Sequence, residues 1–400
     1  MTLPTRLTRA AGLAVAAVTT SVLAACGSAP AQVVSGLAAP AASLPIATSG
    51  AGPANADWAV LQLGGSSTQH DNFWELFVRP TGTRTWKLAT PPGVASNGGL
   101  IVASTGLGLI AGFRPSQLLT FSPLAATADQ GKTWSQGNLV SPGLADVPDA
   151  LAIGPGAWLA LTGAGTVRLG ADLGASWRSI ASRDSLARTA AGRACGLASL
   201  SAVAFDSGGT PMVAGACRRP GMVGLFASTL SGWQSAGLAL PAALGHLTAS
   251  VLGLGDHAGR TTALLAVGHG ASAGIVVAWS GPSGGKAWTF SPVLRTGENR
   301  LLSQSLWGGA AGLVLAGSRG ETIAGPGATW HSVPTLPAHT ATLALGPFGQ
   351  LEALAGHGAT LTAWQLGTGT GVTPATASSG QARWQQLQTI TIQIPYGSSG

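Results

Sequence analysis

The sequence predicts an all-β protein, folded as a single β-propeller. Gly is abundant, at 60 residues, and separates short apolar runs, which indicates many tight turns between strands. Tryptophan recurs at intervals of 42 to 56 residues, a period typical of four-stranded propeller blades. The recurring residues are Trp86, Trp134, Trp177, Trp233, Trp288, Trp330 and Trp384. We therefore expect seven four-stranded blades, with six or eight as the alternatives.

Apolar runs inside these intervals supply the strands. Two blades show three runs before the tryptophan. Those before Trp134 are Gly99–Ala103, Leu107–Ala111 and Leu118–Phe121, and those before Trp330 are Leu301–Trp307, Gly312–Ala316 and Glu321–Ile323. The first blade lacks one strand, because it offers only Trp58–Leu63, Phe73–Val78 and Trp86–Leu88. Near the C-terminus, Thr389–Ile394 alternates with period two. We expect this segment to complete the first blade and close the ring, which removes unpaired sheet edges.

The N-terminus has the features of an export signal. Arg6 and Arg9 precede an uncharged, mostly apolar run from Ala10 to Ala25, which is too short for a permanent membrane helix. The run ends in Leu-Ala-Ala-Cys, and this ending resembles a bacterial lipobox. The resemblance implies cleavage before Cys26, lipidation of its thiol, and location on the outer face of the cytoplasmic membrane. An ordinary cleaved signal is the alternative.

The expected domain organisation follows from these features. Residues 1–25 are the signal, and residues 26–56 are the lipidated cysteine and a tether. The tether is rich in Ala, Pro, Ser and Gly and carries no charge from Gly27 to Ala56, which is typical of a flexible linker. Residues 57–394 form the propeller, and residues 395–400 form a short tail.

Beyond Cys26 the chain has two cysteines, Cys195 and Cys217. An even pair in an exported chain indicates a disulfide, because that compartment is oxidising. The pair flanks two predicted strands, Leu200–Phe205 and Met212–Ala216, joined by a Gly-rich turn. Antiparallel pairing would bring the two cysteines together. Two reduced cysteines in the core are the alternative.

A turn motif occurs before two of the tryptophans. Thr127–Trp134 matches Ser/Thr-x-Asp-x-Gly-x-Thr-Trp at each defined position, and Gly170–Trp177 keeps the Asp, Gly and Trp. The carboxylate can accept hydrogen bonds from turn amides, and glycine permits a positive φ. The expected turn residues are Thr127, Asp129, Gly131 and Trp134 in the first copy, and Asp172, Gly174 and Trp177 in the second.

These motifs resemble the Asp-box (BNR) repeats of the sialidase-like propeller superfamily, over about residues 57–394. That superfamily includes sialidases, other glycosidases, sortilin-type receptors and photosystem assembly factors. In all of them the Asp-box is a structural turn away from the active face, so the resemblance implies fold and not catalysis. It assigns Asp129 and Asp172 to turns.

Catalytic residues of a sialidase are not evident in the sequence. Such enzymes need a buried Tyr nucleophile, but the one tyrosine, Tyr396, lies in the Gly-Ser tail. For a glycosidase with two carboxylates, the candidates on predicted strands are Glu75, Glu321 and Glu352, which would face the central channel or solvent. No spacing selects a pair among them. An exported carbohydrate-active hydrolase remains the alternative function.

The placement of charged residues and histidines limits the classes of ligand that the sequence predicts. The net charge of +7 falls to +5 once Arg6 and Arg9 are removed with the signal, and the basic residues are dispersed, which does not indicate nucleic-acid binding. The histidines lack paired metal-ligand spacing, so no metal or cofactor is expected. We therefore expect a non-catalytic, membrane-anchored module that binds an envelope protein or glycan. Cys195–Ser199 and Arg218–Gly221 are its candidate contact surface, and a plain solvent-exposed loop is the alternative.

Overall fold

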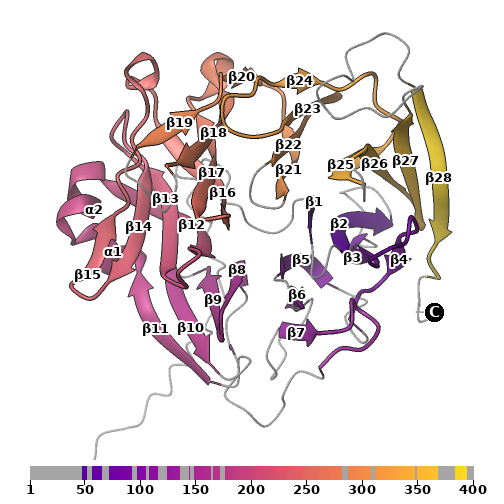
Figure 1. The fold of residues 1–400 in the computed structure, drawn as a ribbon, viewed down its shortest axis with the longest axis horizontal. Helices are drawn as coiled ribbons and strands as arrows, with labels where there is room; N and C mark the ends of the chain where they lie inside the picture. The colour runs from indigo at the N-terminus through magenta and orange to yellow at the C-terminus, as the bar shows by residue number, and fades with distance from the viewer. Residues whose placement is uncertain are drawn as a thin grey trace, which may run out of the picture. The chain divides into compact units, whose positions relative to one another are not determined.

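The computed structural model is a seven-bladed β-propeller, as the sequence predicts, with the sheets arranged in a ring (Figure 1). It describes residues 47–51, 56–64, 72–91, 97–104, 108–115, 124–135, 144, 148–163, 165–171, 176–281, 287–307, 311–346, 349–367 and 383–393. All of these lie in one compact unit, Ala38–Gly400, and the hydrophobic clusters that they form lie in it as well. No helix in these segments is long and apolar enough to span a bilayer.

Each blade is an antiparallel sheet whose strands run from the channel outward in chain order. The first blade is β1 (Thr48–Ala51), β2 (Asp57–Gly64), β3 (Asn72–Arg79) and β4 (Lys87–Leu88). The second blade has β5 (Asn97–Ser104), β6 (Leu109–Pro115) and β7 (Leu124–Thr127). The third blade is β8 (Pro148–Gly154), β9 (Ala157–Thr162), β10 (Thr166–Ala171) and β11 (Ser176–Ser182). In the second blade Ser135 takes the outer position, because its N–H donates to the carbonyl of Ala126 (2.8 Å). The predicted run Leu118–Phe121 lies outside the described residues, and β7 is the third strand there.

The remaining four blades follow the same order. The fourth blade is β12 (Leu197–Phe205), β13 (Pro211–Cys217), β14 (Gly224–Thr229) and β15 (Gly232–Ser235), and the fifth is β16 (Ala249–His257), β17 (Arg260–Val267), β18 (Gly274–Ser280) and β19 (Trp288–Phe290), with β20 (Leu294–Arg295) also paired to β18. The sixth blade is β21 (Leu301–Trp307), β22 (Ala311–Ala316), β23 (Arg319–Ile323) and β24 (His331–Ser332). The seventh blade is β25 (Thr340–Leu345), β26 (Leu351–His357), β27 (Thr360–Gly367) and β28 (Arg383–Thr391). Innermost strands of neighbouring blades pack against each other, as β8 does with β12 and β12 with β16. The apolar residues between adjacent blades therefore form the core.

The repeated tryptophans occupy equivalent places. Each lies at the beginning of the outermost strand of its blade, or directly before it. In three blades the indole N–H donates to a backbone carbonyl of the preceding blade or its outgoing loop: Trp233 to Ile180 (3.1 Å), Trp288 to Ala236 (3.3 Å) and Trp330 to Pro292 (2.9 Å). The period in the sequence therefore reflects a repeated contact between blades.

The first blade corrects one expectation. Its innermost strand is β1, paired antiparallel with β2, and not the C-terminal run. β1 is Thr-Ser-Gly-Ala and lacks an apolar alternation, so its own sequence does not predict a strand. Its hydroxyls bind the neighbouring inner strands instead: Thr48 Oγ1 donates to the carbonyl of Gln304 (3.0 Å), and Ser49 Oγ to that of Leu343 (2.5 Å). The predicted tether over residues 26–56 therefore includes a strand, and its residues before Ala47 lie outside those described.

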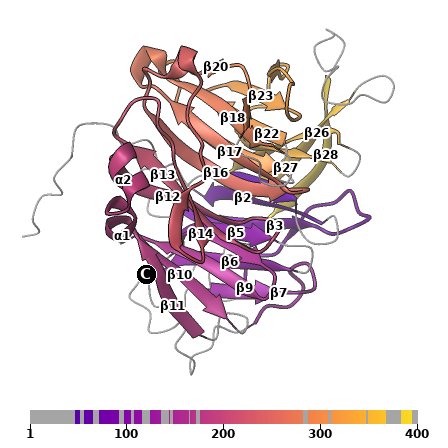
Figure 2. The same ribbon diagram turned by 60° about the vertical axis from the view of Figure 1, so that its left-hand side comes forward.

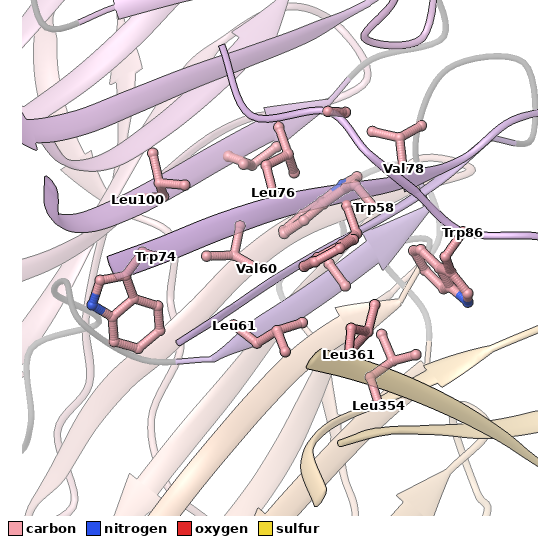
Figure 3. Packing of buried hydrophobic residues seen from close by; sticks show 14 of the residues in the cluster. Trp58, Val60, Leu61, Trp74, Leu76, Val78, Trp86, Leu100, Leu354 and Leu361 are labelled. Carbon is pink, nitrogen blue, oxygen red and sulfur yellow. The ribbon is translucent and has the colours of Figure 1, made fainter. Parts of the chain in front are cut away.

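The C-terminal strand does lie where the ring closes, although it belongs to the seventh blade. β28 pairs with β27 as the outermost strand. The side-chain amide of Gln388 in β28 accepts from the N–H of Trp86 (2.8 Å) and donates to the carbonyl of Trp86 (3.0 Å). Figure 3 shows Trp86 close to Leu354 and Leu361 of the seventh blade, within the cluster that joins the two blades. Side chains of the first and last blades thus close the ring.

Two short helices were not expected from the sequence. α1 (Arg183–Ala187) and α2 (Ala190–Cys195) connect the third blade to the fourth and lie beside β12 and β13 (Figure 2). Each has a side-chain N-cap, Ser182 and Thr189, and α2 ends at Gly196 with φ of 66°. At five and six residues they are too short to show a helical period. Their caps and the packing of Leu186 and Cys195 hold them in place.

Candidate functional site

A central channel runs through the ring and is lined by the innermost strands of the first six blades. Its middle part has a volume of about 220 Å³ and is lined mostly by apolar and hydroxyl side chains, among them Ser49, Leu100 and Ser201. A second part of about 410 Å³ lies where these strands end. The two parts share lining residues such as Trp58 and Leu306, so they are continuous.

We call the second part the acidic funnel, and its apolar wall includes Trp58, Leu151, Ile153, Phe205, Leu254 and Leu306. Asp256, at the end of β16, is the one ionisable residue among the described residues that line it. Burial raises the pKa of Asp256, and the nearby charge of Asp206 raises it further. Asp206 is fixed by its own turn, where its Oδ1 accepts from the amides of Gly208 (2.9 Å) and Thr210 (2.7 Å). Two carboxylates therefore lie near the mouth of a cavity whose wall includes large apolar side chains.

The three glutamates considered from the sequence do not line the channel, since they lie on second or third strands of their blades. Nor are they solvated. Glu75 accepts a hydrogen bond from Thr90, and Glu321 accepts from the Ser332 hydroxyl at 2.9 and 3.0 Å. All three, including Glu352, are buried.

Glu352 belongs to a buried group that joins the first and seventh blades, which we call the seam cluster: Asp57, Arg79, Trp86 and Glu352. The Arg79 guanidinium is 1% exposed and binds Asp57 through Nε (3.0 Å) and Nη2, and Glu352 through Nη1 (2.5 Å). It also lies over the Trp86 ring, 4.8 Å from the ring centre. The Trp86 indole donates to Glu352 Oε2 (3.0 Å). Residues 266 or more positions apart are thereby held together.

Burial outweighs the attraction of Arg79 for both carboxyls of the seam cluster. It raises the pKa of Asp57 from its ordinary value of 3.8 to about 6, and it also raises the pKa of Glu352. One arginine is shared by two desolvated carboxyls, so the folded protein retains a proton more readily than the unfolded chain does.

The stability of the fold should therefore depend on pH in a defined direction. A carboxyl whose pKa is higher when folded contributes stability below its unfolded pKa, and this is lost as pH rises through the folded value. We expect the free energy of unfolding to fall between pH 4 and pH 7, with a shallower fall in Asp57→Asn. Urea denaturation at half-unit pH steps measures this slope, and an Asp184→Asn variant, changed on the surface, is the control. An unchanged slope in Asp57→Asn would contradict the assignment.

Asp129 has a local role in the turn after β7. Its Oδ1 accepts from the amide of Thr133 (2.9 Å) and from the hydroxyl of Thr127 (2.7 Å), and its Oδ2 accepts from the hydroxyl of Thr133 (2.5 Å). These bonds, led by that to Thr133, lower the pKa of Asp129 to about 2. Gly131 has φ of 82°, which favours glycine. The turn connects the third strand to the outer one, so Asp129 stands far from the innermost strand of its blade.

The second copy of the motif is only partly described. Trp177 lies at the start of β11, while Asp172 and Gly174 lie outside the described residues. Cys26 and Tyr396 lie outside them as well. The described residues contain no cluster of His, Cys, Asp or Glu suited to a metal ion.

The predicted disulfide is present. Cys195, at the end of α2, is bonded to Cys217, at the end of β13, with 5.3 Å between their Cα atoms. The amides of Arg218 and Arg219 donate to the carbonyls of Gly196 (3.0 Å) and Cys195 (3.1 Å). The two segments expected to form a contact surface are therefore adjacent, and the helical insert is pinned to the fourth blade.

No protein-family model matches the chain, and no curated protein sequence matches it either. Solved structures of similar shape include YCF48 from Cyanidioschyzon merolae, with 16% identity over 80% of this chain and 94% of that one and a TM-score of 0.47. They also include YCF48 bound to D1 peptide, with 14% identity over 78% and 89% and a TM-score of 0.44. A chain of the mitotic checkpoint complex is 13% identical over 88% of this chain and 96% of that one, with a TM-score of 0.46. At these values the similarity gives no information about function.

Proposed function

We propose that this chain is an exported lipoprotein whose propeller binds a segment of another cell-envelope protein without catalysis. Cys26 carries the lipid and anchors the chain to the outer face of the cytoplasmic membrane. The turns at Thr127–Trp134 and Gly170–Trp177 are Asp-box repeats and maintain the blades. The observation that carries the proposal is the acidic funnel, a cavity with large apolar side chains in its wall and carboxylates at its mouth.

The funnel has the chemistry of a peptide site. A cavity of about 410 Å³ is large enough for one or two side chains, and its wall offers Trp58, Phe205 and Leu306 to an apolar residue. Asp256 and Asp206 give the mouth a negative charge, which favours Lys or Arg next to that residue. The rigid ring keeps the cavity formed before binding, so little ordering cost arises. The preferred ligand is therefore an apolar side chain beside a basic one.

Site-specific photocrosslinking in membranes tests this function. A crosslinking amino acid at Ile153, in the funnel wall, should capture one reproducible envelope protein. The same amino acid at Leu230, an exposed turn residue, should not. Asp256→Lys should abolish the crosslink, while the matched reversal Asp184→Lys, outside the funnel, should leave it intact. Equal capture at both positions, or capture unaffected by Asp256→Lys, would refute the proposed site.

The lipid anchor has its own test. The N-terminal peptide of the membrane-bound protein should start at Cys26 and carry the mass of attached acyl chains, and Cys26→Ser should release the protein from membranes. If the wild type is released like the variant and has no lipid, the proposed anchoring is wrong.

An exported carbohydrate-active hydrolase is a second candidate, favoured by one observation. Asp256 has a raised pKa beside the second carboxylate of Asp206, the kind of pair in which one carboxyl keeps its proton as a general acid. This function requires that the wild type releases sugars from envelope polysaccharide and that Asp256→Asn does not. Binding of glycan without release would favour the non-catalytic module.

A further inference from the structure

The ring has one face on which all innermost strands begin, which we call the entry face. Ala47 pairs in parallel with Ser303 near the start of β21, so the described chain enters the ring there. Loops on this face are joined by backbone hydrogen bonds, such as those from Arg218 to Gly196 (3.0 Å) and from Gly317 to Arg300 (2.9 Å). The acidic funnel opens at the opposite ends of the innermost strands.

Exposed arginines are concentrated on the entry face, along an arc from the third blade to the sixth. They are Arg183, Arg188, Arg193, Arg218, Arg219, Arg295, Arg300 and Arg319. Among the described residues of this face the exposed carboxylates are Asp184 and Glu298, while Asp149 is half-buried and Glu321 is buried. Of the eight arginines, two have ion pairs in the described part of the chain, Arg183 with Asp184 and Arg319 with Glu321. The arc therefore has an excess of positive charge.

The opposite face has a different ratio of basic to acidic residues. The described basic residues there are Arg84, Lys87, Lys132, Arg260 and Arg383, and they share the surface with Asp129, Asp206 and Asp256. The entry face therefore has eight exposed arginines, against three arginines among the described residues of the opposite face. Evenly spread solubility charge would not produce this separation.

We propose that the entry face is a docking surface for a bilayer of anionic phospholipids. Arginine suits this role because its planar fork binds phosphate oxygens in pairs. The geometry rests on the proposed anchoring: 20 residues separate Cys26 from Ala47, a span of at most about 70 Å, and Ala47 lies on this face. An anchored chain would thus hold the arginines over the headgroups and turn the acidic funnel away from the membrane, toward a partner.

Vesicle co-sedimentation of the compact unit Ala38–Gly400, which lacks Cys26 and the apolar signal, tests the surface without the anchor. This unit should bind vesicles containing phosphatidylglycerol, should not bind phosphatidylcholine vesicles, and should be released by salt. Arg218→Gln/Arg219→Gln/Arg300→Gln removes three charges that have no ion pair among the described residues. It should weaken binding on the order of 100-fold, since each basic residue contributes about fivefold.

The matched control is Arg84→Gln/Lys87→Gln/Lys132→Gln, which removes three charges from the opposite face and should bind almost as the wild type does. Equal weakening by both triple variants would overturn the proposal, because net charge alone would then explain binding. Binding to a soluble polyanion but not to vesicles would also overturn it. A finding that Cys26 carries no lipid would refute the proposed anchoring but would not change the vesicle-binding results. A failure of the anchoring and a failure of the docking surface are therefore distinguishable.

Discussion

Replacing Arg79 with methionine is expected to lower the free energy of unfolding by about 3–5 kcal/mol. The guanidinium is 1% exposed and is the cation bound by both Asp57 and Glu352. Without it, two desolvated carboxyls would face each other unless they take up protons. The ring would also lose a contact between its first and last blades. Urea denaturation at pH 7 measures the effect.

Two further variants distinguish loss of charge pairing from loss of packing. Arg178→Met, on an exposed position of β11, should change the free energy of unfolding by less than about 0.5 kcal/mol. Arg79→Met/Asp57→Asn/Glu352→Gln removes all three charges and should recover most of the lost stability, because no charge then remains buried without a counterion. If Arg79→Met behaves like Arg178→Met, the seam cluster does not stabilise ring closure.

Cys195→Ser/Cys217→Ser should lower the free energy of unfolding by about 3 kcal/mol. The disulfide closes a loop with a sequence separation of 22, and a loop of that length gives about this stabilisation in the chain-entropy model. Both sulfur atoms are buried in the cluster that contains Leu186, so the insert should also become more open to exchange. Denaturation of Ala38–Gly400, which has no other cysteine, measures the effect.

Reduction supplies an independent control. Dithiothreitol should destabilise the wild-type unit by a similar amount and leave the double serine variant unchanged. Hydrogen exchange should accelerate in α1 and α2 but not in β26, which is in the seventh blade. Equal stability of the two proteins under oxidising conditions would contradict a stabilising role for the disulfide.

Much of the architecture was predictable from local sequence. The tryptophan period gave the number of blades, because each indole begins the outermost strand of a blade and so recurs once for each repeat. Runs such as Leu301–Trp307 and Gly312–Ala316 are strands in the structure. Gly312–Ala316 was predictable because its apolar residues are buried, whereas the buried residues of Leu301–Trp307 are Ser303, Gln304 and Ser305. Cys195 and Cys217 could be paired because they flank two consecutive strands.

The site was much less predictable. Glu75, Glu321 and Glu352 were considered as channel residues because they lie on strands, yet a strand assignment does not tell which strand is innermost. Asp256 has no sequence pattern that places it at the mouth of the acidic funnel, because that position depends on the packing of the ring. Arg79 has no local sequence signal of its role, since its two carboxylate partners lie 22 and 273 residues away.

The sequence by itself predicted the repeating blade, its count and the disulfide pair, because each follows from residue types at regular or short spacings in the chain. Only the tertiary structure decided how the ring closes, where the carboxylates lie and how arginine is distributed between the two faces. β1 has no strand pattern of its own; it pairs with β2, and its hydroxyls donate to the carbonyls of Gln304 and Leu343. Such contacts depend on the closed ring, which brings distant segments together, and no local pattern encodes them.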